Sequence, residues 1–366
     1  MNKMTKTMNF SGGPGALPAS VLRETSAAID ALPETGLSVL GMSHRSEWFR
    51  GVLDEAERNL RVLLDIPGNY HVLFMQGGSS LQFSMLPMSF LRASGKHAEY
   101  IVSGYWSAKA PVEARHEGIT RVVWDGSAEG YRRLPAPEEL HLAPDAAYLH
   151  YVSNETVEGL EFTDIPGLHE VPLVCDMSSN LLAAPLDINR YAMIYAHAQK
   201  NLGPAGVTVV ILRDEFAQRA THALPTLLDY RTHIRSRSLY NTPPVFAIYV
   251  LMLVTRWLRD EIGGVDNMAA INRVKSEQLY RALDAEPDFY RVHGERACRS
   301  TMNVAFRLPD AAVEAQFIDD ARRDGLHGLE GHRSIGGLRA SLYNAVTPEA
   351  VAVLSQWLGE FRRLRG

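Results

Sequence analysis

The feature that most limits the fold of this chain is a regular alternation of short, apolar, β-branched segments with longer segments of helical character through its first two thirds. Such alternation is typical of an α/β domain around a mostly parallel sheet, because each parallel connection needs a crossover that is usually a helix. We predict seven strands in this region, over residues 71–75, 99–103, 121–124, 147–152, 171–175, 193–197 and 207–212.

Helices are expected between some of these strands and after them. The segments 82–92, 107–118 and 244–259 have helical character, and the last is apolar nearly all round, which predicts burial or an interface. Gly263 and Gly264 indicate a hinge. Beyond it, a compact α+β domain is predicted, with helices over 267–283, 312–324 and 348–363 and strands over 301–308 and 338–343.

Size and composition exclude several classes of protein. A chain of 366 residues is more than one hydrophobic core usually holds, and its net charge of -5 removes the attraction to phosphate backbones that nucleic-acid binding needs. The longest apolar stretch, residues 245–254, has ten residues, about half of a membrane span. With no apolar signal segment at the N-terminus and only two cysteines, we expect a cytoplasmic protein with small-molecule partners, without disulfides or metal.

A glycine- and serine-rich turn follows the first predicted strand. Gly77, Gly78, Ser79 and Ser80 lead from that strand into the predicted helix over 82–92. Free N–H groups at a helix N-terminus bind anions, and hydroxyls add donors, although the same residues also form ordinary turns and N-caps. Because the turn lacks a P-loop lysine and no G-x-G-x-x-G follows a strand, we favour a small phosphate ester over a nucleotide.

Two further polar residues stand next to predicted strands. Asp176 follows an apolar strand, at the end where open α/β sheets bind ligands; its alternative role is to cap a turn with Ser178 or Ser179. Lys200 lies between a strand and a Gly-Pro-Ala-Gly turn. Partial burial there would lower the pKa of its amine and make it a nucleophile, whereas the alternative is an ordinary surface charge.

These features together favour one cofactor. Pyridoxal 5'-phosphate (PLP) needs an anchor for its phosphate, a carboxylate facing its pyridinium nitrogen and a lysine that forms an imine with its aldehyde. A phosphate-binding turn, a carboxylate at a strand end and a loop lysine occur in that order along this chain. The combination therefore predicts PLP chemistry, which none of the three features predicts alone.

Nine collinear motifs resemble those of the phosphoserine aminotransferase family, and their shared order makes the resemblance specific. They are NFSGGPGALP (9–18), SHRSEWF (43–49), GGSSLQF (77–83), SGYWSAKA (103–110), SNETVEG (153–159), CDMSSN (175–180), AQKNLGPAG (198–206), NTPPVFA (241–247) and GHRSIGGLRASLYNA (331–345).

The resemblance implies a class V aminotransferase of PLP fold type I. It implies a large PLP-binding domain over residues 16–265, with a mostly parallel seven-stranded sheet flanked by helices, and a smaller α+β domain from residues 1–15 and 266–366. It also implies a homodimer with active sites at the subunit boundary. The implied reaction is reversible amino transfer between O-phospho-L-serine and 2-oxoglutarate, giving 3-phosphooxypyruvate and L-glutamate in serine biosynthesis. Some bacterial members also use 4-phosphooxy-L-threonine in pyridoxine biosynthesis.

The resemblance further implies roles for single residues. Lys200 would be the Schiff-base lysine and then the general base of a two-stage exchange, and Asp176 would pair with the pyridinium nitrogen. The other implied cofactor residues are Trp106 on the ring, Thr156 at its 3-hydroxyl side, Ser79, Ser80 and Gln199 at the phosphate, and Asn241 and Thr242 from the neighbouring subunit. The family's substrate-binding positions correspond to His44, Arg45, His332, Arg333 and Arg339.

Both substrates carry an α-carboxylate and a distal anion, so the site needs a guanidinium that binds the carboxylate and a second cationic pocket. We assign the carboxylate to Arg339 and the distal anion to the two His-Arg pairs. Two positions depart from some relatives. Gly12 replaces a serine, and Ser80 replaces an arginine, which leaves the cofactor phosphate to hydroxyls and the helix dipole.

Three other functions fit these sequence features less well. Aminotransferases for alanine and glyoxylate share the scaffold but have no distal anion to bind. A cysteine desulfurase needs a reactive loop cysteine, whereas Cys175 ends a predicted strand and Cys298 precedes another. A non-catalytic phosphate-binding module would have no need of Lys200 and Asp176.

Overall fold

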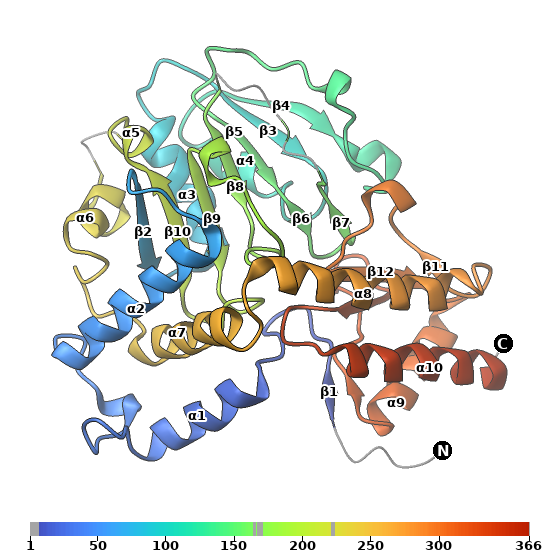
Figure 1. The fold of residues 1–366 in the computed structure, drawn as a ribbon. Coiled ribbons are helices and arrows are strands. Elements are labelled where there is room, and N and C mark those ends of the chain that lie inside the picture. The colour runs from blue at the N-terminus through green and yellow to red at the C-terminus, as the bar shows by residue number, and fades with distance from the viewer. Residues whose placement is uncertain (1–6, 164–165, 167–170, 221–223, 366) are drawn as a thin grey trace.

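A computed structural model describes residues 7–163, 166, 171–220 and 224–365. Its centre is a seven-stranded sheet (Figure 1), made of the seven strands predicted from the sequence, with ends that differ by at most two residues. The strands are β2 (Tyr70–Met75), β3 (Ala98–Val102), β4 (Thr120–Asp125), β5 (Leu149–Val152), β8 (Leu173–Asp176), β9 (Met193–His197) and β10 (Thr208–Arg213).

The direction of the strands decides where a site can form. The order is β2-β10-β9-β8-β5-β3-β4, in which β10 pairs antiparallel with both neighbours and every other pair is parallel. Six strands therefore end at the same edge of the sheet. This confirms the predicted mostly parallel sheet and gathers the segments that follow those strands along one edge.

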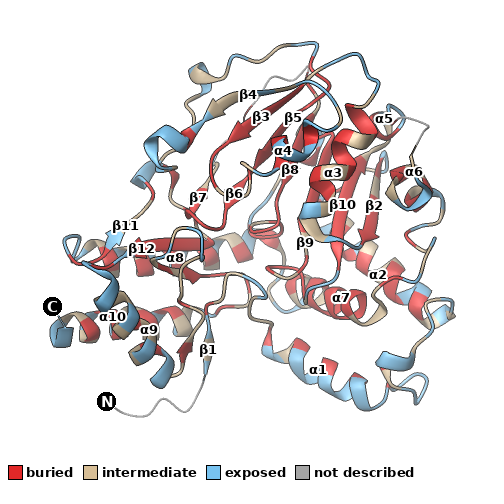
Figure 2. Cartoon of the chain, turned by 180° about the vertical axis from the view of Figure 1, so that it is seen from behind, coloured by how far each residue is buried: buried red, intermediate tan, exposed pale blue. Residues whose placement is uncertain are grey.

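Helices cover both faces of the sheet. Along β2, Val72 and Phe74 belong to one apolar cluster and Leu73 and Met75 to the other, as the period of two in a strand requires. The first face carries α2 (Glu47–Leu64) and α7 (Val245–Asp260), with α1 (Ala19–Asp30) against α7 (Figure 1). The second carries α3 (Gly78–Phe90), α4 (Ala110–Ala114), α5 (Asp214–Ala217) and α6 (Tyr230–Arg235), and Figure 2 shows this face.

No helix among the described residues is long and apolar enough to span a membrane.

The remaining elements form a second core. Gly263 and Gly264, at φ 83° and 105°, join α7 to α8 (Val265–Asp284) in a backbone conformation that favours glycine. The other elements are the antiparallel strands β11 (Arg291–Val292), β12 (Asn303–Arg307) and β14 (Leu338–Ser341), the helices α9 (Ala311–Arg323) and α10 (Pro348–Arg365), and the parallel pair β1 (Met8–Asn9) and β13 (Leu326–His327). Phe10, fully buried, packs into this core. The cluster supports the predicted two-domain division, which stays a prediction.

Two predicted helices differ from the structure. The helix expected over 82–92 begins at Gly78, so the glycine-serine turn forms its first turn. Of the helix expected over 107–118, only Ala110–Ala114 is α-helical. The residues before it form a turn in which the backbone N–H groups of Trp106 and Ser107 donate to the carboxylate of Glu155. The helices α1, α2, α5 and α6 were not predicted.

We predict that Phe10→Ala lowers the free energy of unfolding by about 3–5 kcal/mol, because the change leaves a cavity in the second core. Met8→Ala is the matched control, since Met8 lies in the adjoining strand with a side chain that is only half-buried. Urea denaturation of both variants measures the difference. Equal losses in the two variants would contradict the assignment of Phe10 to that core.

Candidate active site

A cavity of about 350 Å³ lies at the edge where the parallel strands end. Its lining comes from the segments that follow five strands, β2, β3, β5, β8 and β9. The lining includes every predicted cofactor residue outside the 241–242 segment, namely Ser79, Ser80, Trp106, Thr156, Asp176, Gln199 and Lys200. The structure thus brings together residues that are as far as 121 positions apart in the chain.

Lys200 is buried in the wall of this cavity, with 9% of its surface exposed. Its Nζ donates hydrogen bonds to Thr156 Oγ1 at 2.6 Å and to Ser179 Oγ at 2.9 Å, and it forms no ion pair with any described residue. Burial lowers the pKa of the amine to about 8, Asp176 partly opposes this shift, and the positive charge of Arg339 adds to it. A large fraction of the amine is therefore neutral and nucleophilic at mildly alkaline pH.

Asp176 is the last residue of β8, and its side chain is almost fully buried. Its Oδ1 accepts a hydrogen bond from the backbone N–H of Ser178 at 2.8 Å, so the turn-capping role considered from the sequence exists in addition to its place in the cavity. Burial raises the pKa of this carboxyl, whereas the bond from Ser178 and the charge of Lys200 lower it.

The turn after β2 leaves backbone donors free at the start of α3. Gly77 and Gly78 have φ of 92° and 66°, and no side chain caps the helix. A Cβ at Gly77 would collide with the side chain of Leu81, so this close turn requires glycine. Ser79 Oγ lies 2.7 Å from Ser178 Oγ. The first-turn N–H groups and the two serines form a site suited to an anion.

Two buried glutamates hold the turn that carries Trp106. Glu155 accepts hydrogen bonds from the N–H groups of Trp106 at 3.1 Å and Ser107 at 2.9 Å, and Glu158 accepts one from Tyr105 at 2.9 Å. Both follow β5, in and next to the hairpin of β6 (Asn154–Glu155) and β7 (Leu160–Glu161). Burial and the neighbouring Glu155 raise the pKa of Glu158 to about 8. Neither glutamate is among the site residues predicted from the sequence.

The second core contributes two of the predicted substrate residues to the neighbourhood of the cavity. Arg339 donates from Nη1 to the backbone oxygen of Thr156 at 3.3 Å, and its buried Nε has no hydrogen-bond partner. A Cβ at Gly12 would collide with the Arg339 guanidinium. The His332 ring centroid lies 6.4 Å from that of Trp106.

Five other predicted residues do not line this cavity: His44, Arg45, Asn241, Thr242 and Arg333, which is exposed in the loop before β14. His44 and Arg45 precede α2, and the backbone oxygen of Thr242 accepts a hydrogen bond from Gln76 at 3.1 Å. Conversely, Ser178, Ser179 and His197 line the cavity although they were not predicted as site residues. Their positions directly after Asp176 and at the end of β9 are the signal that could have identified them.

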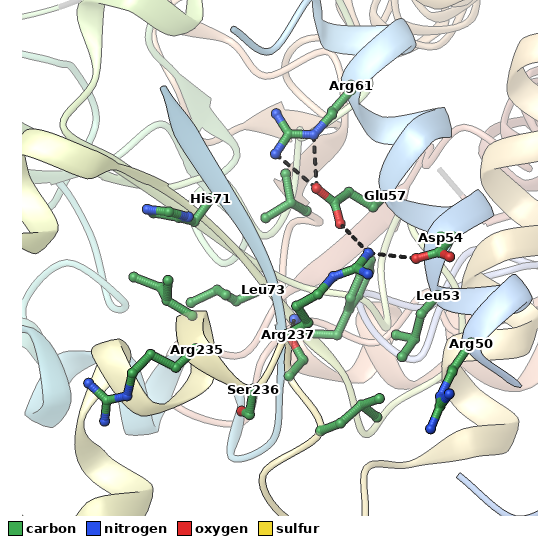
Figure 3. Close-up of a pocket in the computed structure, with 15 residues that line it drawn as sticks. Arg50, Leu53, Asp54, Glu57, Arg61, His71, Leu73, Arg235, Ser236 and Arg237 are labelled. Atoms are coloured by element: carbon green, nitrogen blue, oxygen red, sulfur yellow. Dashed lines mark hydrogen bonds and ion pairs between the residues drawn. The ribbon is translucent and has the colours of Figure 1, made fainter. Parts of the chain in front are cut away.

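A second cavity of about 460 Å³ lies between α2, β2 and the segment after α6 (Figure 3). It is rich in arginine, but Arg61 pairs with Glu57 at 2.9 Å and Arg237 pairs with Asp54 at 2.6 Å. None of the predicted site residues lines it. Among the residues that the structure describes, no cluster of His, Cys, Asp or Glu could hold a metal ion.

Comparison with known proteins places this chain in one family. The family model of class-V aminotransferases matches residues 7–354. The phosphoserine aminotransferase of Rhodopirellula baltica is 46% identical over 97% of this chain and 95% of its own length. The structure of phosphoserine aminotransferase from Bacillus circulans subsp. alkalophilus is 44% identical over 99% of this chain and all of that one, with a TM-score of 0.96. PLP-bound phosphoserine aminotransferase from Trichomonas vaginalis is 36% identical over 97% of this chain and 100% of that one, with a TM-score of 0.91.

The chain therefore belongs to the class-V aminotransferases and, among them, to the phosphoserine aminotransferase family. The predicted family resemblance and fold class are confirmed. The roles of single residues are not decided by these similarities and stay predictions.

We predict that the Lys200 amine of the cofactor-free enzyme titrates near pH 8, since burial disfavours its ammonium form. Mass spectrometry of acylated Lys200, labelled across a pH series, measures the midpoint, with exposed Lys96 in the same sample as a control for reagent reactivity. Asp176→Asn should move the midpoint to lower pH, because it removes a charge that favours the ammonium. A midpoint above about pH 10, the ordinary lysine range, would contradict the burial of this amine.

Proposed function

We propose that this protein is a PLP-dependent phosphoserine aminotransferase, which transfers an amino group reversibly between O-phospho-L-serine and 2-oxoglutarate. The observation that carries the proposal is the buried Lys200 amine, which shares one cavity with Asp176 and with the N-terminus of α3. The names of the full-length relatives support the same reaction, and the relative from Trichomonas vaginalis binds PLP.

The residues of the cavity fit this cofactor. Its volume of about 350 Å³ is in the usual range for small-ligand sites. The N-terminus of α3 with Ser79 and Ser80 would hold the phosphate, with Gln199 beside it, and Asp176 would keep the ring nitrogen protonated. Trp106 would stack on the ring and Thr156 would lie at its 3-hydroxyl side. When bound, PLP supplies an electron sink for the substrate Cα.

Lys200 would hold the cofactor and would also move the proton of the substrate Cα. Its Nζ takes the proton from Cα of the amino donor, and in the second half of the exchange it returns a proton to Cα of the acceptor. The hydroxyls of Thr156 and Ser179 accept hydrogen bonds from Nζ and orient it toward the cavity. Because these partners carry no charge, they do not stabilise the ammonium as a carboxylate would.

The substrate residues form two cationic groups. Arg339 offers a buried Nε without a partner, which suits the α-carboxylate of every substrate in the exchange. His332 and Arg333 would bind the distal phosphate or carboxylate, together with His44 and Arg45. The same pocket would accept 4-phosphooxy-L-threonine, which has one more carbon than phosphoserine.

We include a homodimer in this proposal, with Asn241 and Thr242 completing the partner's phosphate site. Exposed apolar side chains support it, because Leu40 is 64% exposed close to His44 in the chain and Tyr240 is 52% exposed next to Asn241. Two free, buried cysteines suit the reducing cytoplasm, in which we place the enzyme.

The rival functions have less support. Cys175 and Cys298 do not line the cavity, and burial raises the pKa of both thiols, which opposes the thiolate a desulfurase needs. An aminotransferase for alanine and glyoxylate would have no ligand for Arg333 and His332.

We predict that the purified enzyme shows a visible absorption band and that borohydride attaches PLP irreversibly to Lys200, as peptide mass spectrometry would detect. Lys200→Ala should bind the cofactor only noncovalently and lose turnover, because the residue that moves the proton is missing. Full turnover in this variant would disprove the proposal.

We predict that Arg333→Ala lowers kcat/KM for O-phosphoserine by about 10- to 100-fold, the range expected when a charge-assisted hydrogen bond is lost. Alanine, an amino donor without a distal anion, is the matched control and should lose far less. Steady-state kinetics with 2-oxoglutarate as acceptor measures both. Equal losses for the two donors would refute the assignment of the distal anion to Arg333.

A further inference from the structure

Two side chains outside the predicted site lie near His332: Tyr105, which contacts its ring, and Lys109, whose charge acts on it. The rings of Tyr105 and His332 have centroids 4.6 Å apart, and Lys109 Nζ lies 4.6 Å from the Tyr105 centroid and 5.5 Å from that of Trp106. Tyr105, Trp106 and Lys109 belong to the segment between β3 and α4, whereas His332 belongs to the loop before β14. The contact thus joins the cofactor-side turn to the proposed distal-anion residues.

The charges at this contact are positive and unpaired. Burial lowers the pKa of His332, and so do the positive charges of Arg339, Arg333 and Lys109. Within the part of the chain that the structure describes, none of these three cations forms an ion pair with a carboxylate. In the arginine-rich cavity of Figure 3, by contrast, acids of the same cavity pair with Arg61 and Arg237.

The position of Lys109 has a physical cause. Its side chain is exposed, so it could extend into water, but the faces of Tyr105 and Trp106 attract its ammonium. Glu155 and Glu158 in turn hold the backbone of Tyr105 and Trp106. Lys109 is therefore held where its charge acts on His332 together with the charges of Arg333 and Arg339, and a bound anion would make this arrangement favourable.

We propose that Lys109 is a further specificity-determining residue of the distal-anion subsite of His332 and Arg333, and that its ammonium favours a phosphate dianion over a carboxylate. The inference rests on the proposed function, because it concerns the substrate of the same site. A Coulomb interaction grows with the charge of the ligand, and a phosphate monoester carries about -1.5 to -2 at pH 7 against -1 for a carboxylate.

Lys109→Gln in the holoenzyme tests the proposal with three amino donors. The expected losses in kcat/KM are about tenfold for O-phosphoserine, about threefold for glutamate and none for alanine, so that the logarithm of the loss follows the distal charge. Lys109→Arg should restore most of the selectivity, because it restores the charge. Lys96→Gln is the matched control, since this exposed lysine precedes β3, at the opposite edge of the sheet.

A purely structural role of Lys109 would give equal losses for all three donors and would overturn the inference, as would a Lys109→Gln variant that behaves like Lys96→Gln. Thermal unfolding of the variants checks that folding is unchanged.

Binding of inorganic phosphate gives a readout independent of turnover. Calorimetric titration of the holoenzyme at pH 8 should show affinity for phosphate about tenfold weaker in Lys109→Gln than in the wild type and in Lys96→Gln, with a smaller difference at high salt. Equal affinity in all three proteins, or none in the wild type, would overturn the inference. Phosphate binding that depends on Lys109 in an enzyme inactive on O-phosphoserine would disprove the proposed function but keep the anion subsite.

Discussion

The chemistry of this site depends on a lysine amine that is removed from water without being given a counter-ion. Lys200 Nζ bonds to the hydroxyls of Thr156 and Ser179 rather than to a carboxylate. An ion pair would stabilise the ammonium form, which is not nucleophilic. Full exposure to water would leave the pKa of the lysine in its ordinary range. The negative charge of Asp176, which forms no ion pair with Lys200, partly restabilises the ammonium form of Lys200. The balance leaves an amine that can change its protonation state under physiological conditions.

The fold places the groups that produce this balance. Six strands end at one edge, so residues from five strand-end segments surround the amine without any long loop. The second core then adds Arg339 and His332 from its own strands and loops. Asp176 lies in the lining at the edge of the sheet, together with Lys200, whereas the second core contributes the basic side chains Arg339 and His332. A substrate with two anionic groups fits basic residues on that side of the cavity.

The sequence was informative where a feature is local. The strands are short apolar runs in the sequence, so all seven could be located, and the residues after the six strands that run in the same direction lie at one edge. The helix α2 also had a local signal, Ser46 as N-cap and a helical spacing of Phe49, Val52 and Leu53, which the analysis did not use. The turn before α4 had no such signal, because one of its hydrogen bonds runs from the Ser107 N–H to the carboxylate of Glu155, 48 residues away. The place of Lys109 beside His332 depends on the same long-range contacts.

The close approach of Gly12 to Arg339 makes these two positions an epistatic pair. With hydrogen as the side chain at position 12, the N-terminal segment can pass directly over the guanidinium, and the Tyr343 hydroxyl donates to the Gly12 carbonyl at 2.8 Å. Any larger side chain at position 12 would therefore require the Arg339 guanidinium to move away from its present place. The effect of a substitution at residue 12 thus depends on the conformation that residue 339 can adopt, although the two positions are far apart in the sequence.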